Sequence, residues 1–261
     1  MLFMIAGESF TGKSVSAGTF PKPMKYLEFD ANGAESLKHA KGKDGKLIVP
    51  DWEQIDVVSL VKQKVHDLSF VTDMGGRNSK SEPPAHTSEA LDVVAEYNKV
   101  MADLRINKEG YHTVVIDSLT SMFRIWKEMI LWVNKIPHIR QNDYGTLEGV
   151  LGGQFLPNLR ALPVKYVILV NHLFLDMERN KDGEETGVIL GEYPVAPSRP
   201  MGKNMGKYID ELYRQKIEGG EYVWRTKRSG FFQAGSRLNV PDPIKPATFQ
   251  ELSKYINTGG K

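Results

Sequence analysis

The stretch GESFTGKS, residues 7–14, has the spacing G-x-x-x-x-G-K-[ST] of a phosphate-binding loop. The glycines of such a loop allow a tight turn, so several backbone N–H groups point at the phosphates, and the helix that follows adds its partial positive charge. The pattern assigns Lys13 to the β- and γ-phosphates and the Ser14 hydroxyl to Mg²⁺. It therefore predicts a site for ATP and Mg²⁺ along one segment: Gly7, Glu8, Ser9, Phe10, Thr11, Gly12, Lys13, Ser14 and Val15.

Two further polar residues stand at the ends of apolar runs and could complete this site. TVVIDS ends a nearly continuous β-branched run at Asp117, where a carboxylate can hold magnesium through water. The alternative for Asp117-Ser118 is a helix N-cap, since both residue types cap well. His172 follows the run KYVILVN, where a side chain could report which nucleotide is bound; a lone histidine is more often structural.

The elements that must position these residues alternate between strands and helices over the first two thirds of the chain. Apolar runs predict strands at 2–6, 24–29, 55–60, 111–117 and 165–171. Helical spacing predicts helices at 88–106, 119–133 and about 143–162, the last interrupted by Gly152-Gly153 and Pro157. This alternation indicates a parallel α/β sheet with helices on both faces.

The last third has a different pattern. Residues 173–193 read as two strands around the turn N-K-D-G, which predicts a hairpin. Short strands with tight turns then predict an antiparallel extension over 208–245, followed by a short helix. The polar segment 73–84 is expected to be a mobile loop inside the fold, so that 1–261 forms a single domain.

Composition excludes several classes of site. The chain has 261 residues and no cysteine, which removes disulfides, thiolate zinc sites and a cysteine nucleophile. The six histidines do not pair at metal-ligand spacing. No apolar run approaches the roughly 18 residues of a membrane helix, and residues 1–6 do not resemble a secretory signal. We therefore expect no membrane association and a cytoplasmic location.

Charge is balanced overall, with a formal net charge of +2, but it is not evenly distributed. Residues 199–237 contain nine basic and four acidic side chains. Such a local excess could meet nucleic-acid phosphates. A solvated strand surface accounts for it equally well.

Taken together, the motifs GESFTGKS, YLEFDANG, YHTVVIDSLTSMF, VKYVILVNH and VWRTKRSGFFQAGSRLNVP, in this order, resemble the RecA-like P-loop ATPases that bacteriophages encode. Among these the chain looks most similar to the phage single-strand annealing ATPases, over about residues 1–245. The resemblance implies a RecA-like P-loop NTPase core, ATP and Mg²⁺, binding of single-stranded DNA, and a role in recombination. It also implies a homo-oligomer with nucleotide near the subunit interface, and a single-strand binding protein as a possible partner.

Two positions depart from that family's pattern. The acid pair D-x-E, whose glutamate positions the attacking water, reads Asp30-Ala31-Asn32 here. An amide orients water but cannot accept its proton, so Asp30 or Glu28 is expected to substitute, or turnover is slow. The family's K-x-R on a late strand reads Gly235-Ser236-Arg237, which keeps Arg237 as a candidate finger acting on a neighbour's nucleotide.

The resemblance places the DNA contact in loops after the Asp117 and His172 strands. Within 173–207 the cations are Arg179, Lys181, Arg199, Lys203 and Lys207, although five acids lie among them: Asp176, Glu178, Asp182, Glu184 and Glu185. Three interpretations remain open from the sequence: a recombination ATPase, a non-catalytic nucleotide-gated assembly or loading factor, and a P-loop kinase. Asn32 favours the second, whereas the distal GSR fits the first better than the third.

Overall fold

The computed structural model describes residues 1–30, 33–61, 86–136, 138–181 and 184–256. Asn32 and the segment 73–84, which was expected to be a loop, lie outside the described residues. Within the described residues nine strands form one sheet: β1 (Leu2–Gly7), β2 (Met24–Glu28), β3 (Ile55–Ser59), β4 (Thr113–Asp117), β5 (Tyr166–Arg179), β6 (Glu185–Pro194), β7 (Glu211–Glu218), β8 (Glu221–Arg225) and β9 (Gly235–Ser236).

The sheet is mainly parallel, and its order is β3-β2-β4-β5-β1-β7-β8. From β3 to β7 every neighbouring pair is parallel. β8 and β9 pair antiparallel with β7. This confirms the expected fold class, with one refinement: β7, assigned from its sequence to the antiparallel extension, is the last parallel strand, and the extension begins at β8.

The strands β1 and β4 lie in the centre of the sheet because they consist mainly of apolar residues. All five residues of β4 and all six of β1 are buried, as expected for strands covered by helices on both faces. The helices are α1 (Lys13–Gly18), α2 (Ser36–His39), α3 (His86–Ile106), α4 (Leu119–Asn134), α5 (Gln141–Val150), α6 (Leu156–Arg160), α7 (Arg199–Asn204) and α8 (Phe249–Ile256). The predicted interruption at Gly152-Gly153 is a short π-helical segment, Leu151–Phe155, between α5 and α6.

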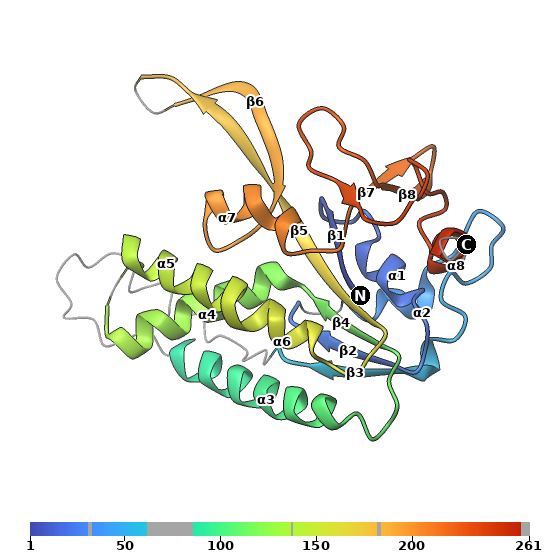
Figure 1. The fold of residues 1–261 in the computed structure, drawn as a ribbon, viewed down its shortest axis with the longest axis horizontal. Helices are drawn as coiled ribbons and strands as arrows, with labels where there is room; N and C mark the ends of the chain where they lie inside the picture. The colour runs from blue at the N-terminus through green and yellow to red at the C-terminus, as the bar shows by residue number, and fades with distance from the viewer. Residues whose placement is uncertain (31–32, 62–85, 137, 182–183, 257–261) are drawn as a thin grey trace, which may run out of the picture.

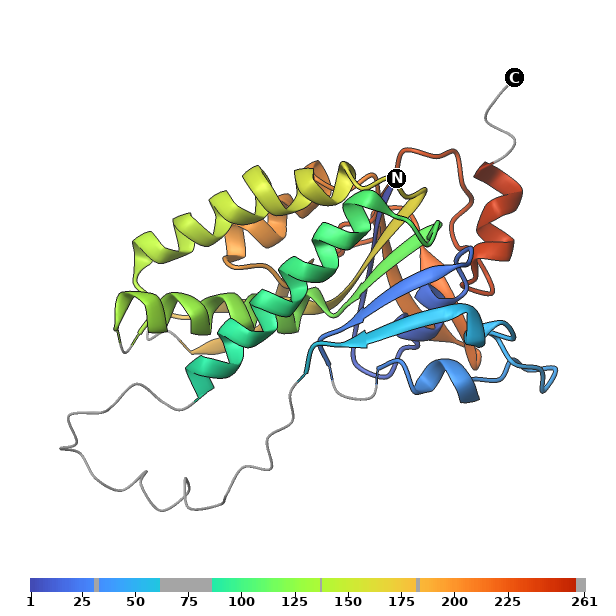
Figure 2. The ribbon, with the colours of Figure 1, turned by 90° about the horizontal axis from the view of Figure 1, so that it is seen from below.

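Two layers of helices cover the sheet (Figures 1 and 2). On one face α3, α4 and the α5–α6 segment pack with Met201 of α7 on the apolar side chains of β4 and β5. On the other face α1, α2 and α8 enclose a second cluster rich in aromatic rings, which include Phe3, Phe20, Tyr26, Tyr166, Tyr213 and Trp224. The carboxyl edge of the parallel strands therefore lies between two rigid layers.

β5 is longer than its sequence predicted. Its parallel pairing with β1 ends at His172, the residue expected to follow the end of the strand, but the strand continues to Arg179. Beyond His172 it pairs antiparallel with β6, and Figure 1 shows this β5–β6 hairpin extending away from the body of the molecule. The predicted hairpin is thus continuous with the central sheet. Within the described residues, no helix has both the length and the apolar character needed to cross a bilayer.

Candidate nucleotide-binding site

The loop between β1 and α1 is shaped by two glycines that admit no side chain. A Cβ on Gly7 would lie 2.8 Å from the backbone oxygen of Gln215 on β7. Gly12 has a φ of +80°, and a Cβ there would lie 2.4 Å from the ring of Tyr222 on β8. The loop is thus pressed against β7 and β8, and only glycine permits this approach.

Lys13 begins α1 and is 7% exposed. Its Nζ donates a hydrogen bond of 2.5 Å to the Glu8 carbonyl oxygen, so the side chain folds back over the loop. Burial lowers the pKa of Lys13, and the negative charges of Asp117 and Asp30 oppose that shift. A buried ammonium with two carboxylates near it is suited to hold a polyanion together with a divalent cation.

Asp117, at the end of β4, meets the first turn of α1. The Ser14 hydroxyl donates to Asp117 Oδ2 at 2.5 Å, and the hydroxyl of Tyr26 on β2 donates to the same oxygen. Asp117 is 4% exposed, and burial raises its pKa while the hydrogen bonds from Ser14 and Tyr26 oppose the rise. Ser118 caps α4 through its side chain, so the N-cap function belongs to Ser118, and the magnesium role of Asp117 stays a prediction.

These oxygens fit a magnesium ion that is bound chiefly through the nucleotide. Mg²⁺ prefers hard oxygen ligands and usually takes one or two from the protein, the others from phosphates and water. Ser14 and Asp117 supply that number. Among the described residues no cluster of three or more His, Cys, Asp or Glu side chains could hold a metal ion.

Asp30 and Glu28, the two acids considered as substitutes at the Asn32 position, have different surroundings. Glu28 is 7% exposed, and its Oε1 accepts the Ala34 N–H at 2.7 Å, so it stabilises the turn after β2. Asp30 is half-buried, accepts a hydrogen bond from Ser121 of α4, and acts by charge on both Lys13 and His172. Asp30 is therefore the acid nearer to the expected phosphate position.

His172 lies opposite Gly7 in the register of β1 and β5. Burial lowers its pKa and the positive charge of Lys13 lowers it further, while the charge of Asp30 opposes the shift, so the neutral imidazole is favoured. Its backbone N–H donates to Thr120 Oγ1, which in turn donates to Asn171 Oδ1 at 2.6 Å. The first turn of α4 thus contacts both His172 and Asp30.

Gln215 of β7 is a site residue that sequence reasoning missed. It is 1% exposed, its Nε2 donates to the Thr11 carbonyl oxygen at 3.0 Å, and its Oε1 accepts from Trp224 Nε1 at 2.6 Å. The amide therefore ties the phosphate-binding loop to β7 and β8. A single glutamine within ELYRQKIE has no distinguishing spacing, and only the pairing of β7 with β1 brings it to the loop.

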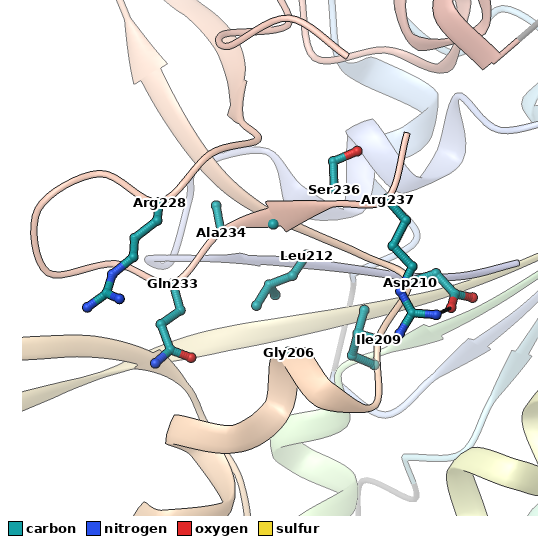
Figure 3. Close-up of a pocket in the computed structure, with 10 residues that line it drawn as sticks. Gly206, Ile209, Asp210, Leu212, Arg228, Gln233, Ala234, Ser236 and Arg237 are labelled. Atoms are coloured by element: carbon teal, nitrogen blue, oxygen red, sulfur yellow. Dashed lines mark ion pairs between the residues drawn. The ribbon is translucent and has the colours of Figure 1, made fainter. Parts of the chain in front are cut away.

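Arg237 lies away from the phosphate-binding loop of its own chain. It follows β9, which pairs with Glu211 and Leu212, and these lie level with Phe3 and Met4 rather than with Gly7. Its side chain is 63% exposed and pairs with Asp210 at 3.0 Å. Arg237 lines a cavity of about 340 Å³ with an apolar floor, whose other end is formed by Arg228 and Gln233 (Figure 3). In the part of the chain that the structure describes, Arg228 makes no ion pair.

The basic residues expected to face DNA in 173–207 are largely paired with acids. Arg199 and Lys203 of α7 both bind Asp176, which is fully buried, and Lys203 does so at 2.9 Å. Arg179 pairs with Glu185 at 3.5 Å. These three cations are therefore paired with acids of the β5–β6 hairpin. Of the five cations proposed to face DNA, Lys181 and Lys207 remain.

Comparison with solved structures gives low similarity over most of the chain. The RadB recombinase is 14% identical, with a TM-score of 0.38, and the match covers 90% of this chain and 83% of that one. The flagellar accessory protein FlaH from Methanocaldococcus jannaschii is 13% identical, with a TM-score of 0.38 and coverage of 93% and 83%. An ATPase from the type III secretion system of pathogenic bacteria is 10% identical, with a TM-score of 0.39 and coverage of 84% and 51%.

Comparison of sequences gives a clearer result. No curated protein matches the chain. A family model does match, and it spans residues 1–238, from the first strand through the phosphate-binding loop, Asp117, His172 and the strands β7 to β9. The chain belongs to the AAA domain family, which supports a P-loop protein that binds nucleotide.

Proposed function

We propose that the protein binds ATP with Mg²⁺ and hydrolyses it. The observation that carries this proposal is the 2.5 Å hydrogen bond from Ser14 to Asp117, because it joins the end of the phosphate-binding loop to the acid of a neighbouring strand. The Ser14 hydroxyl and the Asp117 carboxylate would hold the magnesium ion, which would supply positive charge beside the nucleotide phosphates. Lys13 neutralises the same phosphates, and the bound ion supplies further neutralisation of the charge that develops on transfer.

Asp30 is the general base in this proposal. It lies at the end of β2, close enough to Lys13 and His172 to act on both by charge, and Ser121 of α4 holds its carboxylate. A carboxylate there can accept the proton of a water that attacks the γ-phosphate, which an asparagine cannot do. The presence of this acid favours hydrolysis over a non-catalytic nucleotide-gated factor.

The nucleotide cycle serves, in our proposal, the binding and annealing of single-stranded DNA during phage recombination. The resemblance of the motifs to phage annealing ATPases supports this part of the proposal. The charges of 173–207 support it less, because Arg179, Arg199 and Lys203 are paired with acids.

The test is ATP hydrolysis by the purified protein, with and without single-stranded DNA, at several salt concentrations. We expect DNA to stimulate turnover and the stimulation to fall steeply with salt, because phosphate contacts release counterions. A near-zero rate with ATP bound, unchanged by DNA, would favour the nucleotide-gated factor instead. Transfer of labelled phosphate to a nucleoside would show a kinase.

An arginine acting on the nucleotide of a second copy is the other element of the proposal. Arg237 is already paired with Asp210, whereas Arg228 is exposed at the opposite end of the same cavity (Figure 3). We expect Arg228→Ala to lower turnover on the order of 10³-fold, as loss of an arginine finger does, and Arg237→Ala to lower it less. ATP binding should be unchanged in both variants.

The control is Arg160→Ala, because Arg160 also binds Asp210 and its loss disturbs that ion pair while both candidate arginines remain. Turnover should be measured over a range of protein concentrations, since a contribution from a second copy rises with concentration. Wild-type rates in both Arg228→Ala and Arg237→Ala would remove the finger role from this cavity.

A further inference from the structure

We propose that Tyr26 is a positioning residue for the magnesium site, whose hydroxyl holds the Asp117 carboxylate in the orientation that receives the ion. The inference rests on the proposed nucleotide function and adds a residue to it. Tyr26 lies in β2, next to the strand that ends at Asp117, and it is the first residue of the motif YLEFDANG, in which only the acids and Asn32 were assigned a role. It acts through Asp117 and is not assigned any contact with the nucleotide.

The first observation is that the phenol is fixed. Tyr26 is fully buried in the aromatic cluster between the sheet and α1, and β3 and β4 flank its strand on both sides. A buried tyrosine hydroxyl needs a hydrogen-bond partner, and here that partner is Asp117 Oδ2. Because the ring cannot move without disturbing the core, the position of its hydroxyl is set by packing.

The second observation is that the same oxygen accepts from Ser14 as well. The two donors belong to different elements. Ser14 lies in the first turn of α1, directly after the phosphate-binding loop, whereas Tyr26 lies in the sheet. When the Ser14 oxygen turns a lone pair to the metal, the hydrogen bond from Tyr26 still restrains the carboxylate. Of the two donors, Tyr26 is thus the one that still holds the Asp117 carboxylate when the metal is bound.

The third observation is that Gly33 in the turn after β2 lies close to both Asp117 and Glu28. A Cβ on Gly33 would lie 3.3 Å from Asp117 Oδ2 and 3.5 Å from Glu28 Oε1. A carboxylate that rotated toward Glu28 would meet a second negative charge. The hydroxyl of Tyr26 prevents this by holding Oδ2, in the way that outer partners orient the ligands of other metal sites.

The experiment measures how Mg²⁺ strengthens nucleotide binding in the full-length protein. A fluorescent, non-hydrolysable ATP analogue is titrated into the protein in EDTA and then over a series of Mg²⁺ concentrations. For Tyr26→Phe we expect wild-type affinity in EDTA and a half-saturating Mg²⁺ concentration raised roughly tenfold, the usual effect of losing an outer partner of a metal ligand. Hydrolysis is not needed for this readout.

Tyr166→Phe is the matched control. Tyr166 lies in the same aromatic cluster and is 2% exposed, but it packs on Phe3, Phe20 and Phe249, away from Asp117. Both its EDTA affinity and its Mg²⁺ dependence should equal those of the wild type. A parallel change in Tyr166→Phe and Tyr26→Phe would show a packing effect and overturn the proposal.

Amino-acid analogues at position 26 separate the hydroxyl from the ring. 4-Aminophenylalanine keeps a donor at the same place and should restore the wild-type Mg²⁺ dependence, whereas 4-methylphenylalanine fills the space without a donor and should behave as Tyr26→Phe. This pair also provides the test if Tyr26→Phe does not fold. Equal Mg²⁺ dependence in the two analogues overturns the role of Tyr26 alone, while a wild-type protein that binds no nucleotide overturns the proposed function as well.

Discussion

Lys13→Ala should abolish ATP binding at concentrations where the wild-type protein is saturated. Lys13 is the buried cation of the phosphate-binding loop, and its removal leaves the phosphates and Asp117 without their nearest positive charge. Truncating one partner of a buried charge pair costs about 2–5 kcal/mol, so the affinity should fall by about 30-fold to about 4,000-fold. Calorimetry or fluorescence with ATP and Mg²⁺ gives the affinity directly.

Lys22 offers a closely matched control for this loss. It is also a buried lysine beyond the same helix, where its Nζ donates to the Gly18 carbonyl oxygen at 2.6 Å and pairs with Asp51 at 2.9 Å. Lys22→Ala therefore removes an equivalent side chain away from the loop, and it should leave the ATP affinity near the wild-type value. If Lys13→Ala bound ATP normally, the assignment of the loop GESFTGKS would be wrong.

Asp30→Asn should stop hydrolysis and leave ATP binding largely intact. The substitution keeps the shape of the side chain and its hydrogen bond with Ser121, but an amide accepts no proton from water. Loss of a general base typically lowers the rate on the order of 10²- to 10⁴-fold. Single-turnover hydrolysis of labelled ATP, with binding measured in parallel, separates the chemical step from affinity.

Glu28→Gln decides between the two acids near this position. A glutamine oxygen can still accept the Ala34 N–H, so the turn after β2 should persist. We expect Glu28→Gln to retain most of the turnover. The reverse result, an active Asp30→Asn and an inactive Glu28→Gln, would transfer the role of base to Glu28.

The fold was largely predictable because its signals are local. The apolar runs of β1, β4 and the first half of β5 and the helical spacing of α3 and α4 each lie within about 20 residues. The direction of β7, in contrast, has no local signal in the sequence. Whether its sequence runs parallel or antiparallel to β1 is decided by the connection over 195–210, which carries the chain back to the amino edge before β7 begins.

The candidate site divides in the same way. Lys13, Ser14 and Asp117 could be proposed from the sequence because each lies at or after the end of a strand in a recognisable motif. Tyr26 and Gln215 were not, because neither residue has a distinguishing spacing, and the role of each depends on which strands pair with its own strand. Asp176 was counted among the acids that weakened 173–207 as a DNA contact. In the structure it is buried and forms ion pairs with Arg199 and Lys203.

Because β5 is one continuous strand, it connects the central sheet directly to the hairpin. The first half of β5 pairs with β1 and β4, and this half ends at His172, beside the phosphate-binding loop. The second half forms one strand of the extended hairpin with β6 (Figure 1). From His172 to Arg179 an extended strand measures about 23 Å, so a tilt of about 5° at His172 moves the far end by about 2 Å. A small tilt of β5 at His172 would therefore move the far end of the hairpin more, and α7 would follow because Asp176 of β5 binds both Arg199 and Lys203.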